Sequence, residues 1–298
     1  IYQKNIVERK ILREQLNNEN YLYARESTRV YSGKSLDAIH FPVGGIGSGC
    51  IQMSGNGEMS IWQIFNNFTE QKVPESFLAI RVKEDGKPAV VRALQTSAIG
   101  NLQGMKSNEF RGEYPLAEYD FKDCSLPVSV KLEAFSPFIA MNAKESAIPC
   151  VIFKVTVENT GSKKAEVSVL QSQQNAVGYD GQKLIENRNY SGYAGNVNKV
   201  INNGKYTVLD MASAGLDKSG SMALACVSEN AAGVAYWGSL DELINDIKAD
   251  GKLYGLSETA PSASGTTISG AVTDFVVLNP GESKTVDFVL TWYFPNVE

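Results

Sequence analysis

The chain has 298 residues, of which 43% are hydrophobic and 20% charged, and its formal net charge of -5 fits an ordinary globular protein rather than a disordered or fibrous one. At this length one large domain or two modest ones are possible. Because 28 Lys and Arg residues stand against 33 acids and form no basic run, we expect no nucleic-acid partner.

The chain carries no obvious targeting or membrane segment. It begins at Ile1 rather than Met, which indicates that an upstream segment was removed and is consistent with export to the periplasm or the cell exterior. No apolar run approaches the roughly 18 residues of a membrane span, so we expect no transmembrane segment. The four cysteines form no C-x-x-C pair, and we interpret them as buried thiols rather than as a disulfide framework or zinc site: Cys50, Cys124, Cys150 and Cys226.

Residues 1–34 form a predicted helical or extended lead-in. Their apolar residues recur among many charges at helical spacing, which predicts a short amphipathic helix over about residues 4–17. Asn17 and Asn18 then interrupt this pattern.

A glycine-rich stretch, "FPVGGIGSGCIQMSGNGEMSIWQIFNN", occupies residues 41–67. A phosphate-binding loop would need a following helix, and the P-loop form also needs a Lys before Ser or Thr. The pattern instead predicts a strand, a turn at Asn56-Gly57 and a second strand. We therefore interpret the glycines as sites of positive φ or close backbone approach and name five candidate domain-interface residues: Gly44, Gly45, Gly47, Gly49 and Trp62.

From residue 41 onward apolar and polar residues alternate along most of the chain, as in half-buried strands. The clearest predicted strands are residues 77–83, 128–135, 150–157, 165–170, 222–227, 233–237, 274–278 and 285–294. Turn-forming residues separate several of them, at 84–87, 158–161 and 279–281. We therefore predict that residues 35–298 form a mainly β domain, a large sandwich of two antiparallel sheets with one or two short helices in its connections.

Two segments break the alternation. Ser239 and Glu242 make a capping-box pattern before an apolar stripe that Gly251 ends, which predicts a short helix. Residues 171–205 are rich in Asn, Gln, Gly and Tyr, which predicts a long excursion between strands. A functional loop and a plain surface loop both remain open for that excursion.

Spacing alone reveals no catalytic constellation, no cofactor site and no metal site. His40 is the only histidine and no G-x-S-x-G elbow is present, so we interpret His40 as a structural or surface residue. The alternative that Cys50 acts as a nucleophile beside His40 stays open. A glycosidase needs a pair of carboxyl groups, although we expect most acids of this chain to lie on solvated faces. The candidates for such a pair are five acids: Glu58, Glu113, Glu118, Asp120 and Asp123. For the three tryptophans we favour core packing over sugar stacking: Trp62, Trp237 and Trp292.

Several segments, taken in order, resemble one known family. "FPVGGIGSG" followed by the hairpin and "IWQIFNN" is similar to the glycine-rich entry motif of the non-lysosomal glucosylceramidase and bile-acid β-glucosidase family (glycoside hydrolase family 116-like). "EYPLAEYDF", "FSPFIAMNAKESAIPCVIFKVTVENTG" and "NPGESKTVDFVLTWYFPN" follow in the family's order. The resemblance covers about residues 35–296, and its specificity lies in the ordered set.

In that family these segments belong to an N-terminal β-sandwich domain, whereas the two carboxylates of a retaining mechanism lie in a following (α/α)₆ barrel. The resemblance therefore implies a non-catalytic domain of a hydrolase that acts on β-glucosides or glucosylceramide-like substrates. Its expected partner is the catalytic barrel beyond Glu298, and no catalytic residue of the family falls on this sequence. An independent carbohydrate-binding or structural module and a self-sufficient enzyme with an unrecognised carboxylate pair remain the alternatives.

Overall fold

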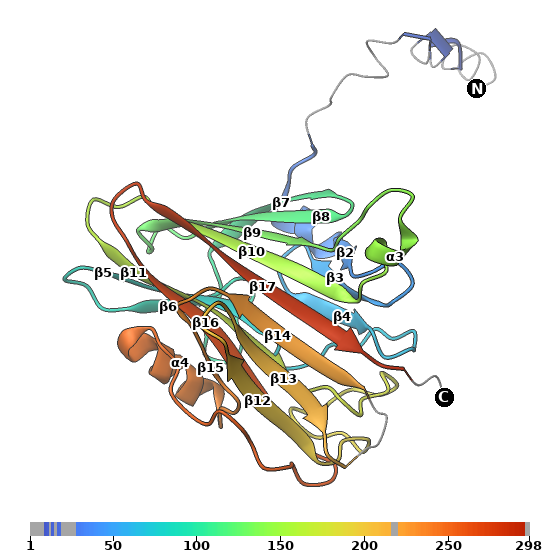
Figure 1. The fold of residues 1–298 in the computed structure, drawn as a ribbon. Coiled ribbons are helices and arrows are strands. Elements are labelled where there is room, and N and C mark those ends of the chain that lie inside the picture. Colours follow the sequence, from blue (N-terminus) through green and yellow to red (C-terminus); the bar gives the residue numbers. More distant parts are fainter. Residues whose placement is uncertain (1–8, 12, 15–16, 19–27, 216–219, 296–298) are drawn as a thin grey trace.

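The computed structural model describes residues 9–11, 13–14, 17–18, 28–215 and 220–295 (Figure 1). These residues form antiparallel sheets packed as a sandwich with a few short helices, which confirms the predicted fold class. Of the helix predicted over residues 4–17, residues 9–11 and 13–14 are helical, and most of the rest lies outside the described residues.

The larger layer is a nine-stranded sheet with the order β1-β7-β8-β9-β10-β17-β14-β13-β12. Its strands are β1 (Tyr31–Ser32), β7 (Ser107–Glu113), β8 (Leu116–Lys122), β9 (Val128–Phe135), β10 (Cys150–Asn159), β12 (Asn196–Asn202), β13 (Thr207–Ser213), β14 (Ser221–Val227) and β17 (Ser283–Tyr293). The last strand in sequence, β17, lies inside this sheet between β10 and β14. At one edge β1 pairs with β7, so the sheet includes residues that precede the predicted boundary at residue 35.

Two smaller sheets complete the sandwich. The five-stranded sheet has the order β15-β16-β11-β5-β6 and consists of β5 (Phe77–Glu84), β6 (Val90–Ala93), β11 (Ala165–Gln174), β15 (Ala231–Val234) and β16 (Ser269–Leu278). A three-stranded sheet, which the sequence pattern did not predict as a separate layer, consists of β2 (His40–Val43), β3 (Cys50–Ser54) and β4 (Met59–Gln63).

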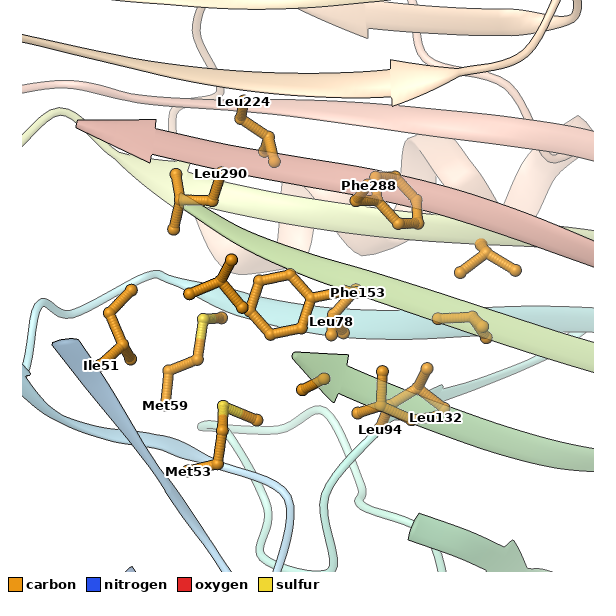
Figure 2. Packing of buried hydrophobic residues seen from close by; sticks show 14 of the residues in the cluster. Ile51, Met53, Met59, Leu78, Leu94, Leu132, Phe153, Leu224, Phe288 and Leu290 are labelled. Carbon is orange, nitrogen blue, oxygen red and sulfur yellow. The ribbon is translucent and has the colours of Figure 1, made fainter. Parts of the chain in front are cut away.

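The three sheets share one hydrophobic core. Figure 2 shows its side chains meeting from every layer: Ile51, Met53 and Met59 from the three-stranded sheet, Leu78 from the five-stranded sheet, and Leu132, Phe153, Leu224, Phe288 and Leu290 from the nine-stranded sheet. Each fully buried side chain of this kind stabilises the fold by about 1.5–3 kcal/mol. The three-stranded sheet is therefore fixed to the sandwich by the packing of its inner face.

Three short helices lie in connections: the 3₁₀ helix η1 (Gly33–Ala38), α3 (Ala143–Ser146) and α4 (Leu240–Asp250). The predicted helix is α4, where the Ser239 hydroxyl accepts a hydrogen bond from the Glu242 amide at 3.2 Å and Gly251 ends the helix in the left-handed conformation. The Glu242 carboxylate accepts from the Gly238 amide rather than from Ser239, so the capping box is shifted by one residue.

Most predicted strands are confirmed, with longer ends than predicted. The strand predicted at 233–237 is shifted to β15. The prediction missed the short strands β1, β2 and β6 and four strands with polar outer faces: β7, β8, β12 and β13. In β7 and β8 the outward residues are charged, and cross-strand ion pairs such as Lys122–Glu109 at 2.5 Å hold them in place. These pairs compensate for the low β propensity of Glu and Asp.

The excursion predicted over residues 171–205 is shorter and less exposed than expected. Residues 171–174 belong to β11 and residues 196–202 to β12, which leaves 175–195 as the connection. This connection buries six large or apolar side chains: Ala176, Val177, Tyr179, Ile185, Tyr190 and Tyr193. The segment therefore supplies part of the core and does not lie wholly on the surface.

Candidate functional site

The glycine loop, residues 44–49, connects β2 to β3. A strand rather than a helix follows Gly49, so no helix N-terminus is present there to bind a phosphate. Gly44, Gly47 and Gly49 have φ angles of +153°, +72° and +91°. Side chains strongly disfavour these backbone conformations, which is why glycine occupies all three positions.

Three of the four candidate glycines lie against other backbone of the same chain. A Cβ atom added to Gly44 would lie 2.3 Å from the Gly49 carbonyl oxygen, and one added to Gly45 would lie 2.4 Å from the Ile148 carbonyl oxygen. At Gly49 it would lie 2.7 Å from the Gln63 carbonyl oxygen. A Cβ atom added to Gly47 would have no other atom within 4 Å, so this glycine lies at the open side of the loop.

The fifth candidate residue, Trp62, is fully buried in β4, and its indole nitrogen donates to the Met59 carbonyl at 3.2 Å. The tryptophan that contacts the glycine loop is Trp292 of β17, which donates to the Ser48 carbonyl at 2.8 Å. Trp62, Trp237 and Trp292 expose 0%, 4% and 3% of their surface, which confirms core packing. Sequence reasoning missed the role of Trp292 because 244 positions separate it from Ser48.

A cavity of about 630 Å³ opens beside the glycine loop. Its lining comes from Gly45 and residues 47–50 of the first hairpin, residues 63–64 and 66–68 after β4, Pro149, and residues 292–294 at the end of β17. Phe68 and Tyr293 at this cavity are 84% and 63% exposed. We call this region, together with the α3 connection beside it, the loop end of the sandwich. In Figure 1 it lies at the right, around α3, β4 and the arrowhead of β17.

The connection 175–195 also reaches the loop end. The Asn67 amide donates to the Asp180 carbonyl at 2.9 Å, and Phe65 packs edge-on against Tyr179 with ring centroids 4.9 Å apart. Burial and the neighbouring Asp180 carboxylate raise the pKa of Tyr179 to about 12, so its hydroxyl stays protonated at neutral pH. These contacts attach the connection 175–195 to the segment that lines the cavity at Asn67.

The five carboxylates singled out from the sequence lie elsewhere or are already bound. Glu118 pairs with Lys131 at 2.6 Å, Asp120 pairs with Arg111, and Asp123 pairs with Arg92 at 2.9 Å. Glu113 accepts from the Thr28 hydroxyl at 2.6 Å, and Glu58 accepts from Gln95 at 3.1 Å. These partners attach the five acids to neighbouring strands and turns.

One carboxyl group in the described part of the chain has a raised pKa. Burial raises the pKa of Asp274 on β16, because desolvation disfavours its charged form, while the Ser228 hydroxyl donates to one of its oxygens at 2.9 Å. Asp274 is not among the residues that line the cavity beside the glycine loop. Its raised pKa is a property of the core.

The histidine and cysteines form no constellation. His40 is exposed at the start of β2, and the Cys50 thiol donates to the Gln63 side chain at 3.5 Å. Cys150 and Cys226 are buried as predicted, Cys50 is half-buried, and Cys124 is exposed, so the prediction was wrong for Cys124, which lies in the turn after β8. Over residues 28–215 and 220–295, and in the short described pieces before them, no three His, Cys, Asp or Glu side chains could hold a metal ion, and no helix could span a membrane.

A comparison with known protein families decides where the chain belongs. Residues 40–298 match the family described as beta-glucosidase 2, glycosyl-hydrolase family 116 N-term. The chain belongs to this family. The match begins at the first residue of β2 and includes the glycine loop, the cavity and β17, so the candidate site lies entirely within the family's N-terminal region.

Three of the solved structures that resemble the family 116 chain are distant from it in sequence. A bacterial glucoamylase in complex with acarbose is 13% identical with a TM-score of 0.42, and the match covers 74% of this chain and 27% of that one. A polysaccharide lyase is 12% identical with a TM-score of 0.38, and the match covers 92% of this chain and 33% of that one. The α-galactosidase AgaB of Geobacillus stearothermophilus is 10% identical with a TM-score of 0.31, and the match covers 75% of this chain and 30% of that one. The chain thus spans a third or less of the length of these proteins, and no curated protein matches it.

Proposed function

We propose that this chain is the non-catalytic N-terminal domain of a family 116 glycoside hydrolase that acts on β-glucosides or glucosylceramide-like substrates. The catalytic carboxylates, a nucleophile and an acid/base for a retaining mechanism, belong to a barrel domain that follows in the protein. The sandwich supports that barrel and shapes its entrance through the loop end, consistent with the frequent location of ligand sites between domains.

The observation that carries this proposal is the state of the chain's own acids, within a match to the N-terminal region of the family. A retaining glycosidase needs two carboxyl groups about 5–5.5 Å apart across the scissile bond. The five candidate acids are instead bound to Lys131, Arg111, Arg92, Thr28 and Gln95. These hydrogen bonds and ion pairs attach the five acids to neighbouring strands and turns, which supports a structural role for them.

Hydrolysis of a chromogenic β-glucoside tests the proposal. The 298-residue chain is compared with the natural full-length protein under the same conditions. Activity in the full-length protein alone is the expected result. Turnover by the 298-residue chain that disappears when one carboxylate pair is replaced by amides would instead identify a self-sufficient enzyme.

A second candidate function, an independent carbohydrate-binding module, is favoured by the two exposed aromatic side chains at the cavity, Phe68 and Tyr293. Aromatic rings exposed beside a cleft can stack on the apolar faces of sugars. Calorimetric titration of the 298-residue chain with glucose, cellobiose and a glucoside carrying an apolar aglycone distinguishes the two functions. Binding that Phe68→Ser abolishes would support the module, and an absence of binding would support the accessory domain.

A further inference from the structure

A strip of large apolar side chains lies exposed at the loop end, beside the cavity. It comes from the glycine loop, from the turn between β7 and β8, and from the connection that carries α3. We define this apolar strip by six residues: Ile46, Tyr114, Phe138, Ile139, Met141 and Ile148. Met141 is fully exposed, and the other five expose between 41% and 53% of their surface.

Hydrogen bonds and a ring contact join the three segments into one surface. The Ile46 amide donates to the Ser146 carbonyl at 2.8 Å, and the Ser146 hydroxyl bonds to both the amide and the carbonyl of Ile139, at 2.9 and 3.0 Å. The rings of Tyr114 and Phe138 pack edge-on with centroids 5.6 Å apart. The backbone beneath the strip is therefore fixed, and the apolar side chains are presented on a rigid base.

Met141 combines a fully exposed side chain with an unfavourable backbone conformation. All six methionines lie in described residues, and the other five are buried: Met53, Met59, Met105, Met211 and Met222. Met141 also has a φ of +65°, a left-handed conformation that non-glycine residues rarely adopt. A fully exposed apolar side chain held in a strained conformation contributes little to the stability of this domain by itself, whereas it is well suited to insert into a partner.

We propose that the apolar strip is the surface on which the domain that follows β17 docks; this rests on the proposed function. The carboxyl end of β17 lies at the same end of the sandwich, since residues 292–294 line the cavity together with the glycine loop and Pro149. Any polypeptide that continues from β17 leaves from beside the strip, so a following domain is tethered there at high effective concentration. Helix α3 exposes two charged side chains of opposite sign, Lys144 and Glu145. Because these charges balance, the surface suits an apolar partner better than a highly charged one.

Hydroxyl-radical footprinting tests the proposal, because thioether oxidation follows exposure. The rate of Met141 oxidation is measured in the 298-residue chain and in the natural full-length protein, with the exposed Tyr254 beyond α4 as the internal reference. We expect Met141 oxidation to be at least about fivefold slower in the full-length protein, with Tyr254 unchanged. Equal Met141 rates, or a natural protein that ends at Glu298, would overturn the proposal.

Two variants separate docking from folding. Met141→Asp should not lower the melting temperature of the 298-residue chain, because the side chain is fully exposed and Asp tolerates a positive φ at least as well as Met. In the full-length protein it should raise the oxidation of Tyr114 and Phe138 to the rate of the isolated chain. Leu256→Asp, at another exposed apolar side chain beyond α4, is the matched control and should change neither the melting temperature nor the oxidation of Tyr114 and Phe138. If Met141→Asp instead dissociates a dimer of the isolated chain and the full-length protein shows no protection, the strip binds a second copy and the proposal is wrong.

The same experiments distinguish this inference from the proposed function. Protection of Met141 in a full-length protein that hydrolyses no β-glucoside would support docking and contradict the assigned activity. Glucosidase activity without protection would support the activity and overturn the docking surface.

Discussion

The outer face of the five-stranded sheet and the loop end both present large apolar side chains, but the fold treats them differently. On the sheet, α4 places Leu243 and Ile247 over Phe77 and Leu170, and all four expose 4% of their surface or less. At the loop end, the short helix α3 covers no comparable area, and Met141 is left fully exposed.

This difference identifies which surface is complete and which is available to a partner. A covered face stabilises the domain through its own burial, so its apolar residues need no other explanation. An uncovered apolar strip on a fixed backbone gains that stabilisation only when another surface covers it. Four predictions test the distinction and its physical basis.

The largest effect should come from Gly45→Val, which acts on the base of the loop end. The added side chain would overlap the Ile148 carbonyl oxygen and the Ala147 carbonyl carbon, which lie 2.4 and 2.7 Å from where its Cβ atom would be placed, and both atoms are backbone. We expect a loss of about 3 kcal/mol or more in the free energy of unfolding, measured by urea denaturation. Gly47→Ala is the control and should cost only about 1 kcal/mol, through its positive φ. Equal costs would mean that close approach is not what fixes the loop.

The contrast between the covered and the uncovered surface is tested by two truncations of isoleucine. Ile247→Ala removes side-chain atoms that α4 buries against the sheet and should lower the free energy of unfolding by about 2–4 kcal/mol. Ile139→Ala in the apolar strip should change the free energy of unfolding of the 298-residue chain by less than about 0.5 kcal/mol. Thermal unfolding of both variants under one set of conditions measures the contrast. A cost at Ile139 as large as that at Ile247 would mean that the strip already contributes to the core.

A smaller effect is expected at Asp123, outside both regions. Burial alone would raise the pKa of this carboxyl, but hydrogen bonds from Ser125 and the Arg92 guanidinium outweigh burial and hold the pKa below its usual value. Asp123→Asn should therefore lower stability at pH 7 by about 1–3 kcal/mol. Because a lowered folded-state pKa stabilises only while the group is ionised, the gap between the two proteins should close as the pH falls through that pKa. A gap independent of pH would contradict the ion pair as its cause.

The smallest effect is expected at Asp274, in the sheet that α4 covers. Burial raises the pKa of this carboxyl in the folded state, so its ionisation opposes folding, and stability should fall as the pH rises from the unfolded-state pKa, near 3.9, through the folded-state value. Asp274→Asn keeps an acceptor for the Ser228 hydroxyl and should be more stable than the parent chain at pH 7, by up to about 1 kcal/mol, and equal to it at pH 3. Unfolding measured at both pH values checks the sign, and a less stable variant at pH 7 would refute it.

The fold class, most central strands and helix α4 could be predicted from the sequence alone, because these depend on local periodicity and on capping residues close together in the chain. The sequence also indicated that the glycine loop needs bare backbone, since four glycines within six positions serve little else. The strands β7 and β8 escaped notice because cross-strand ion pairs, rather than β propensity, stabilise their outer faces.

The make-up of the loop end, in contrast, depends on tertiary contacts. The partners there are far apart in sequence: Trp292 with Ser48, Asn67 with Asp180, and Ile46 with Ser146. Alternation within a strand states which side chains face inward, but it does not state which distant segments meet. For the same reason the exposure of Met141 could not be predicted, because exposure depends on what the rest of the fold leaves uncovered.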